Sequence, residues 1–117
     1  MTHNVPCIVH IVTWRLNGAT AEVRKQQAQS MVQAFEAARF EVPGLLHLQV
    51  GPNVIEAPDA WDVALYMVFS SRIHLDAYLV HPSHLDIKQL VGPIRAARSQ
   101  VDFELPHFPA GDRNEKS

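Results

Sequence analysis

The chain has 117 residues, which is enough for one domain of the usual size but not for two. Hydrophobic residues make up 47% of it and charged residues 19%, which is typical of a folded globule and not of a disordered chain. Lys plus Arg is 10 and Asp plus Glu is 12, so the net charge of −2 provides no basic field for nucleic acid or an anionic membrane.

Cysteine and histidine are the residue types whose numbers bear most on function. The single cysteine, Cys7, excludes an intrachain disulfide and a zinc site built from cysteines. No basic residue lies beside Cys7 to activate its thiol, so we interpret it as a small buried strand residue. The seven histidines matter more, because histidine ordinarily titrates near neutrality.

The amino-terminal residues, MTHNVPCIVH, have neither the basic nor the apolar region of a secretory signal. No apolar stretch approaches the roughly 18–20 residues of a membrane-spanning helix. An unpaired cysteine suits a reducing compartment. We therefore expect a cytoplasmic protein that binds no nucleic acid and enters no membrane.

Residues 7–16 are mostly β-branched and apolar, and Asn17-Gly18 closes them like a turn, so they predict a strand. Both faces of this strand are largely apolar, which favours a central strand covered on both sides. His10 is therefore expected in an apolar environment. Its neighbours on the same face are Ile8, Val12, Trp14 and Leu16.

Thr20 is a suitable cap for a helix that runs to about Arg39, and Pro43-Gly44 ends the segment. Residues 45–51 alternate as a second strand, and residues 52–60 form a connection with two prolines. Leu46, Leu48 and Val50 are expected on one face of that strand. The apolar stripe of the helix consists of Ala28, Met31, Val32, Phe35 and Ala38.

Residues 61–69 predict a third strand, and Ser70 or Ser71 is placed to cap a short helix through Val80. Pro82 suits the first turn of a second helix, which Gly92-Pro93 must kink or restart. Residues 99–105 alternate once more and predict a last strand. The apolar stripe of the second helix consists of Ile87, Leu90, Val91 and Ile94.

This order of elements predicts a ferredoxin-like βαββαβ sandwich of the α+β class, a four-stranded antiparallel sheet with helices on one face. We assign residues 1–105 to this domain. Residues 106–117 form a polar tail with two prolines and a glycine, and we expect it to be flexible unless a partner holds it.

A sheet with helices on one side needs a cover for its other face. We expect that face to exceed the roughly 300–600 Å² apolar patch of a typical monomer. The simplest cover is a second copy of the chain, so the sequence predicts a homodimer. The residues expected on the uncovered face are Trp14, Val63, Leu65, Met67 and Phe69.

The most informative motif is the helix entry at residues 78–84, Tyr-Leu-Val-His-Pro-Ser-His. Other motifs accompany it along the chain: His10-Ile11-Val12 with Trp14, Val42-Pro43-Gly44-Leu45, Trp61-Asp62-Val63-Ala64-Leu65 with Phe69, Pro93, and Val101-Asp102-Phe103. In this order and spacing they resemble the stress-responsive dimeric α/β-barrel (Dabb) domain family. The resemblance extends from Val9 to Leu105.

The resemblance implies a homodimer whose two sheets close into one barrel, with a pocket between sheet and helices for a small apolar or aromatic ligand. Most members of the family have no known activity. One member, a plant polyketide cyclase that makes olivetolic acid, closes an aromatic ring by an intramolecular aldol condensation. Its catalytic tyrosine and histidine correspond to Tyr78 and His84, and its first-strand histidine corresponds to His10.

Two further pocket residues of that cyclase, a histidine and a tyrosine, fall at Val63 and near Phe35 in this chain. The pocket implied here is therefore more apolar and makes fewer hydrogen bonds, so its substrate should differ from the cyclase's. The candidate ligand-binding residues are Trp14, Phe35, Val63, Leu65 and His81.

Aldol or enol chemistry needs a base whose pKa lies near the working pH and a donor for the developing oxyanion. His84 is the candidate base, Tyr78 the donor, and His10 either orients His84 or acts as a second donor. No metal or organic cofactor is required. Structural interpretations stay open: His81 and His84 can cap backbone N–H groups, Tyr78 can be a core aromatic, and His10 a satisfied buried histidine.

A metal site is a second interpretation of the histidines. His81 and His84, with Asp86 close by, could ligate zinc, but a tetrahedral site needs about three or four protein ligands. The other candidates, His10, His47 and His74, lie on different elements, so we expect no metal site.

Other polar residues are expected at the surface. His3, His47, His74 and His107 are interpreted as surface histidines. Lys88, Arg95 and Arg98 make a modest basic helix face, which is either solvated or able to hold the carboxylate of an anionic ligand.

Three functions therefore stay open. The first is a dimeric protein that binds a small molecule in its pocket without catalysis. The second is a cyclase or isomerase that acts on an enolisable carbonyl compound through His84 and Tyr78. The third is a structural, stress-linked dimer whose barrel is filled by Trp14, Met67 and Phe69. A cofactor-free oxygenase, as in related barrels, is a weaker fourth.

Overall fold

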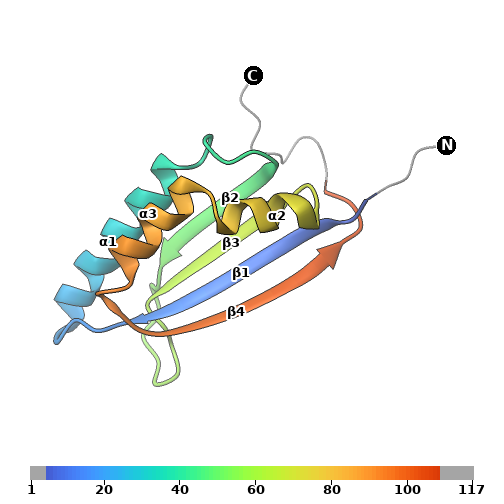
Figure 1. The fold of residues 1–117 in the computed structure, drawn as a ribbon. Helices are drawn as coiled ribbons and strands as arrows, with labels where there is room; N and C mark the ends of the chain where they lie inside the picture. Colours follow the sequence, from blue (N-terminus) through green and yellow to red (C-terminus); the bar gives the residue numbers. More distant parts are fainter. Residues whose placement is uncertain (1–4, 109–117) are drawn as a thin grey trace.

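The computed structural model describes residues 5–108, which form one antiparallel sheet of four strands with three helices against one face (Figure 1). The strands lie side by side in the order β2-β3-β1-β4. This is the ferredoxin-like βαββαβ sandwich that the sequence predicts. The elements in chain order are β1 (Cys7–Leu16), α1 (Ala21–Ala37), β2 (Leu45–Pro52), β3 (Val63–Phe69), α2 (Arg72–Leu79), α3 (Pro82–Val91) and β4 (Arg95–Leu105).

The three helices begin where the sequence places their caps. The side chain of Thr20 accepts a hydrogen bond from the backbone of Val23, and that of Ser71 accepts one from His74. The Nδ1 atom of His81 accepts a hydrogen bond from the backbone N–H of Ser83 at 3.1 Å, and Pro82 occupies the first position of α3. Each cap satisfies a backbone donor that the helix itself leaves free.

The end of α3 differs from the sequence prediction. The helix ends at Val91 instead of kinking at Gly92-Pro93, because proline cannot donate the next helical hydrogen bond. The chain turns there, and the backbone of Asn17 donates to the carbonyl of Ile94 at 2.8 Å. Strand β4 consequently begins at Arg95, four positions before the predicted start, so Arg95 and Arg98 lie on a strand and not on a helix face.

The turn before β2 depends on a glycine. Gly44 has φ of 78°, in the left-handed region, and the ring of His74 lies directly over it. The pairing of β2 with β3 then shifts register between Leu45 and His47. Because of this bulge, Leu46 and Leu48 lie on opposite faces of the sheet, and the prediction that they share a face is wrong.

The main core lies between the sheet and the helices. It contains Trp14, Val63, Leu65, Met67 and Phe69, together with residues of α1, α2 and α3 such as Met31, Phe35 and Ile87. The prediction that the five strand residues form the uncovered face is therefore wrong. These five side chains are bulkier than the apolar side chains on the other face of the sheet, and the apolar stripes of the helices cover them.

We call the opposite side of the sheet the outer face. It carries a second, smaller cluster made of Cys7, Val9, Leu46, Val68 and Phe108, with Ile11, Tyr66 and Leu105 packed against it. Two apolar residues of β4 on this face remain open to solvent, Val101 at 59% and Phe103 at 44% exposure. Apolar surface is thus left on the outer face, although its residues are not the predicted ones.

The chain after β4 is described only as far as Phe108. Phe108 is buried on the outer face, and its ring centroid lies 5.4 Å from that of His47. The prediction of a flexible tail concerns mostly residues 109–117, which lie outside the described residues. Within residues 5–108, no helix is long and apolar enough to cross a membrane.

Candidate functional site

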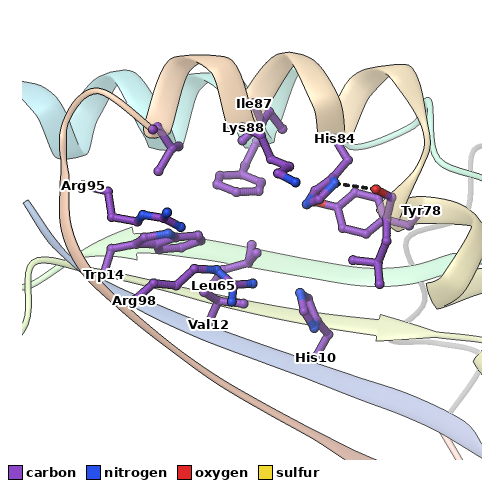
Figure 2. Close-up of a pocket in the computed structure, with 14 residues that line it drawn as sticks. His10, Val12, Trp14, Leu65, Tyr78, His84, Ile87, Lys88, Arg95 and Arg98 are labelled. Carbon is purple, nitrogen blue, oxygen red and sulfur yellow. Dashed lines mark hydrogen bonds between the residues drawn. The ribbon is translucent and has the colours of Figure 1, made fainter.

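A pocket of about 370 Å³ opens between α3 and the helix-facing side of β1 and β4 (Figure 2). Its volume falls within the range of small-molecule sites, which is roughly 300–1,000 Å³. The lining is mostly apolar, with a few polar groups. The residues that line it are His10, Val12, Trp14, Phe35, Leu65, Tyr78, Leu79, His84, Ile87, Lys88, Val91, Gly92, Arg95 and Arg98.

His84 is oriented by the end of the preceding helix. Its Nδ1 atom lies 3.0 Å from the carbonyl oxygen of Leu79, and a carbonyl can only accept, so Nδ1 carries the proton. In the neutral ring Nε2 then keeps its lone pair, and no hydrogen bond joins Nε2 to another residue between 5 and 108. A histidine held in this way has one nitrogen available as a base.

The surroundings of His84 keep its ring neutral. Burial is the main reason that its pKa lies below the ordinary value of 6.5, and the hydrogen bond to Leu79 partly opposes that shift. Positive charge on Lys88, His10 and Arg98 lowers the pKa further. Because a base must be unprotonated to act, this environment favours proton abstraction near neutral pH.

Tyr78 lies against His84, with their ring centroids 4.6 Å apart. The side chain is almost fully buried, and burial raises the pKa of its hydroxyl well above 10, an effect that Arg98 partly opposes. The hydroxyl therefore stays protonated. It makes no hydrogen bond to any residue that the structure describes, and it is not sealed in the core, so it is free to donate to a bound molecule.

His10 forms a pair with an acidic residue of the neighbouring strand. Its Nδ1 atom lies 2.5 Å from Oδ1 of Asp102, and His10 is only 1% exposed. The register of β1 and β4 places these two residues directly opposite each other. The second carboxylate oxygen of Asp102 accepts a hydrogen bond from Gln100 at 2.6 Å. Asp102 therefore orients His10, and in the described structure His10 makes no hydrogen bond to His84.

Six of the predicted site residues line the pocket: the candidate catalytic residues His10, Tyr78 and His84, and the candidate ligand-binding residues Trp14, Phe35 and Leu65. Two do not. Val63 is buried in the main core opposite Trp14, and His81 caps α3.

The sequence did not single out Asp102 as a site residue, nor did it place Lys88, Arg95 and Arg98 at a pocket. The strand register and the early start of β4 bring Asp102, Arg95 and Arg98 to the site, and Lys88 reaches it from α3.

The remaining histidines have other environments. His74 is half-buried: its Nδ1 atom lies 2.9 Å from Oγ of Ser70 and 2.8 Å from Oγ of Ser71. His47 is also half-buried, with its ring 5.7 Å from that of Tyr66. The prediction that both lie at the surface is therefore wrong, whereas His107 is exposed and His3 lies outside the described residues.

Metal binding was the second interpretation of the histidines. Across residues 5–108, no group of three or more histidine, cysteine, aspartate or glutamate side chains is arranged to hold a metal ion. The Nδ1 atoms of His81 and His84 are both engaged by backbone groups of their own segment.

The fold and the pocket define a class of protein, a ferredoxin-like α+β sandwich with a small-molecule-sized cavity between sheet and helices. The chain belongs to the Dabb family, the Stress responsive A/B Barrel Domain, whose model matches residues 8–105. No curated protein matches the sequence.

Solved structures show the same fold. A dimeric protein of unknown function with a ferredoxin-like fold from Bacteroides fragilis is 25% identical, with a TM-score of 0.76, and the match covers 85% of this chain and 96% of that one. A dimeric ferredoxin-like protein of unknown function from Thermobifida fusca is 23% identical, with a TM-score of 0.76, covering 90% and 96%. A hydroxynitrile lyase from Passiflora edulis is 15% identical, with a TM-score of 0.70, covering 88% and 97%.

Proposed function

We propose that this protein is a homodimer that binds a small organic molecule in the pocket between α3 and the sheet. The observation that carries the proposal is the pocket itself, about 370 Å³ in volume and lined by apolar side chains around a few polar groups. A cavity of this composition is the usual form of a small-molecule site. The ligand we expect has an apolar or aromatic body.

The outer face supports the dimer. Val101 and Phe103 leave apolar surface exposed beside the cluster around Val9 and Val68. Relatives of the same fold are dimeric. A second copy of the chain would remove this surface from water, which is the main favourable term in association.

Sedimentation velocity tests the dimer. The wild-type protein should sediment as a dimer at micromolar concentration, and Val101→Glu should shift it toward the monomer, because a charge would be buried without a partner. Val54→Glu is the matched control, since Val54 is 87% exposed in the β2–β3 connection. A wild-type monomer, or a Val101→Glu dimer as stable as the control, would contradict the proposal.

Ligand binding can be tested with acetophenone, a small aromatic ketone, by ligand-observed NMR. Ile87→Trp should abolish binding, because Ile87 is buried on the pocket side of α3 and the larger ring would occupy the cavity. Ile73→Trp is the matched control, since Ile73 is 77% exposed on α2. Circular dichroism checks that both variants fold. Binding that survives in a folded Ile87→Trp variant would place the ligand elsewhere.

A second candidate function, acid–base catalysis, is favoured by the arrangement of His84 and Tyr78. We infer that the protein acts as a cofactor-free cyclase or isomerase on an enolisable carbonyl compound. Nε2 of His84 removes the proton from the carbon beside the carbonyl group, and the C–H electron pair forms the enolate. The hydroxyl of Tyr78 donates to the enolate oxygen. His10, oriented by Asp102, is a further polar group, with its ring centroid 6.4 Å from that of Tyr78.

The protonated His84 then returns the proton, either to carbon, which completes an isomerisation, or to the alkoxide formed when the enolate attacks a second carbonyl of the same molecule. Both routes balance without an oxidant, reductant or metal. The lowered pKa of His84 and the raised pKa of Tyr78 suit these two roles, one as base and one as donor.

Exchange of the acetophenone methyl protons in deuterium oxide measures the first step without knowledge of the natural substrate. The protein should accelerate this exchange, and His84→Ala should abolish the acceleration. Tyr78→Phe should reduce it by roughly 10²–10³-fold, the usual effect of removing an oxyanion donor. His107→Ala, at an exposed histidine, is the control. Bound acetophenone with no accelerated exchange would refute catalysis and leave the binding proposal intact.

A further inference from the structure

Three cationic side chains line the pocket. Lys88 comes from the last turn of α3, and Arg95 and Arg98 come from the first part of β4. Figure 2 shows Arg95 beside Trp14 and Arg98 reaching from the same side toward Leu65, whereas Lys88 points toward His84. No acidic side chain lines the pocket with them.

The two arginines have no ion-pair partner among residues 5–108. The acidic group that acts on Arg98 is Asp102, but its two oxygens already accept hydrogen bonds from His10 and Gln100. Within the described part of the chain, no carboxylate oxygen lies within ion-pair distance of either guanidinium group. Arginine that lines a pocket without a partner is suited to bind a carboxylate with two parallel hydrogen bonds.

The positive charges of Arg95 and Arg98 also repel each other. Burial is the main reason that the pKa of Arg98 is lowered, and the positive charge of Arg95 is the second largest cause. Lys88 has a structural explanation, because a cation in the last turn of a helix interacts favourably with the helix dipole. That explanation does not extend to two arginines on a strand, where a bound anion would relieve the repulsion.

We propose that the molecule bound in this pocket is an organic carboxylate, whose charged group is held by Arg95 and Arg98 while its apolar body lies along Trp14 and Leu65. This inference rests on the proposed small-molecule function and names its ligand class. The carboxyl end of α3, at Val91 and Gly92, also lines the pocket. Its negative dipole end disfavours a phosphate dianion more than a carboxylate.

The opposite end of the same molecule would reach His84 and Tyr78. A ligand held by its carboxylate at Arg95 and Arg98 therefore presents the far end of its body to the base and the donor (Figure 2). If the protein is an enzyme, its substrate is a keto acid or a related carbonyl compound, with the enolisable carbonyl remote from the carboxylate.

The test compares two ligands of the same body, para-acetylbenzoate and its neutral methyl ester. Their affinities for the folded wild-type protein are measured by titration of amide resonances in NMR. We expect the carboxylate to bind about tenfold more tightly than the ester at low ionic strength, which is a typical gain for hydrogen bonds to a charged group. Added salt should reduce this advantage.

Variants identify the groups responsible. The double variant Arg95→Met/Arg98→Met should remove the difference between the two ligands, because methionine keeps an apolar stem of similar length but carries no charge. Arg72→Met is the matched control, since Arg72 is an exposed arginine of α2. It should retain the full preference for the carboxylate.

Two results would overturn the inference in distinguishable ways. If the ester binds in the pocket as tightly as the carboxylate, or if the double variant keeps the preference, the carboxylate assignment is wrong and small-molecule binding stands. If neither ligand shifts resonances of pocket residues, the proposed binding function fails as well.

Discussion

Replacing Asp102 with alanine should destabilise the fold through His10. His10 is 1% exposed, and its Nδ1 atom has Asp102 as its hydrogen-bond partner at 2.5 Å. Without the carboxylate, a buried donor is left unsatisfied inside the protein. Such a loss costs about 1–3 kcal/mol of folding free energy.

For a domain of this size, about 1 kcal/mol lowers Tm by about 4 °C, so Asp102→Ala should lower Tm by about 4–12 °C. Asp102→Asn keeps an acceptor oxygen opposite Nδ1 and loses only the charge, so its cost should be close to about 1 kcal/mol. Thermal unfolding followed by circular dichroism measures both, at one fixed protein concentration because dimerisation contributes to stability.

Glu104→Ala is the control for this experiment. Glu104 lies two residues further along β4 on the same side of the sheet, is exposed, and has no hydrogen-bond or ion-pair partner within residues 5–108. Its replacement should leave Tm nearly unchanged. If Asp102→Ala unfolds at the same temperature as Glu104→Ala, the pair does not hold His10 in place, and the orientation inferred for His10 is wrong.

Two further predictions concern the base and the backbone. If His84 is the base, the rate of acetophenone proton exchange should rise with pH through an inflection below 6.5, and Lys88→Met should move that inflection upward, because Lys88 helps to lower the pKa of His84. An inflection unmoved in Lys88→Met, as in a Lys25→Met control, would count against this electrostatic coupling. Gly44→Ala should destabilise the protein by at least about 1–2 kcal/mol in urea unfolding, because φ is 78° there and a Cβ would lie 2.2 Å from Cδ2 of His74. Gly51→Ala, with no atom within 4 Å of the added Cβ, should have little effect, and equal effects at the two glycines would refute this reasoning.

The elements themselves could be predicted because their signals are local. Thr20 and Ser71 are good caps, Pro82 favours the start of a helix, and the alternation of residues 7–16 is that of a strand. Each depends on neighbours within a few positions. The end of α3 was less predictable, because Gly92-Pro93 allows a kink as well as a stop, and only pairing with β1 makes Arg95 the first residue of a strand.

The faces of the sheet could not be predicted in the same way. Alternation separates Val63, Leu65 and Met67 from Tyr66 and Val68, but it does not say which set the helices cover. Both sets are apolar, so the choice depends on how the helical stripes pack. The bulge at Leu45 and His47 adds one residue to β2, which no alternation pattern reveals.

The sequence predicted those site residues that lie close together along the chain. Tyr78 and His84 are six positions apart, and the break between α2 and α3 brings their rings together. Asp102 lies 92 positions from His10, and their contact requires the register of two strands. An acidic residue in the last strand was visible in the sequence, but nothing there indicated which residue of the first strand it would face.

The central claim is that a small molecule binds between α3 and the sheet, beside His84. Isotope-edited nuclear Overhauser spectroscopy of acetophenone bound to the wild-type protein tests it most directly. The account predicts contacts from the ligand to the methyl groups of Val12 and Ile87 and to the ring of His84, all of which line the pocket. Contacts confined to Val101 on the outer face would contradict it.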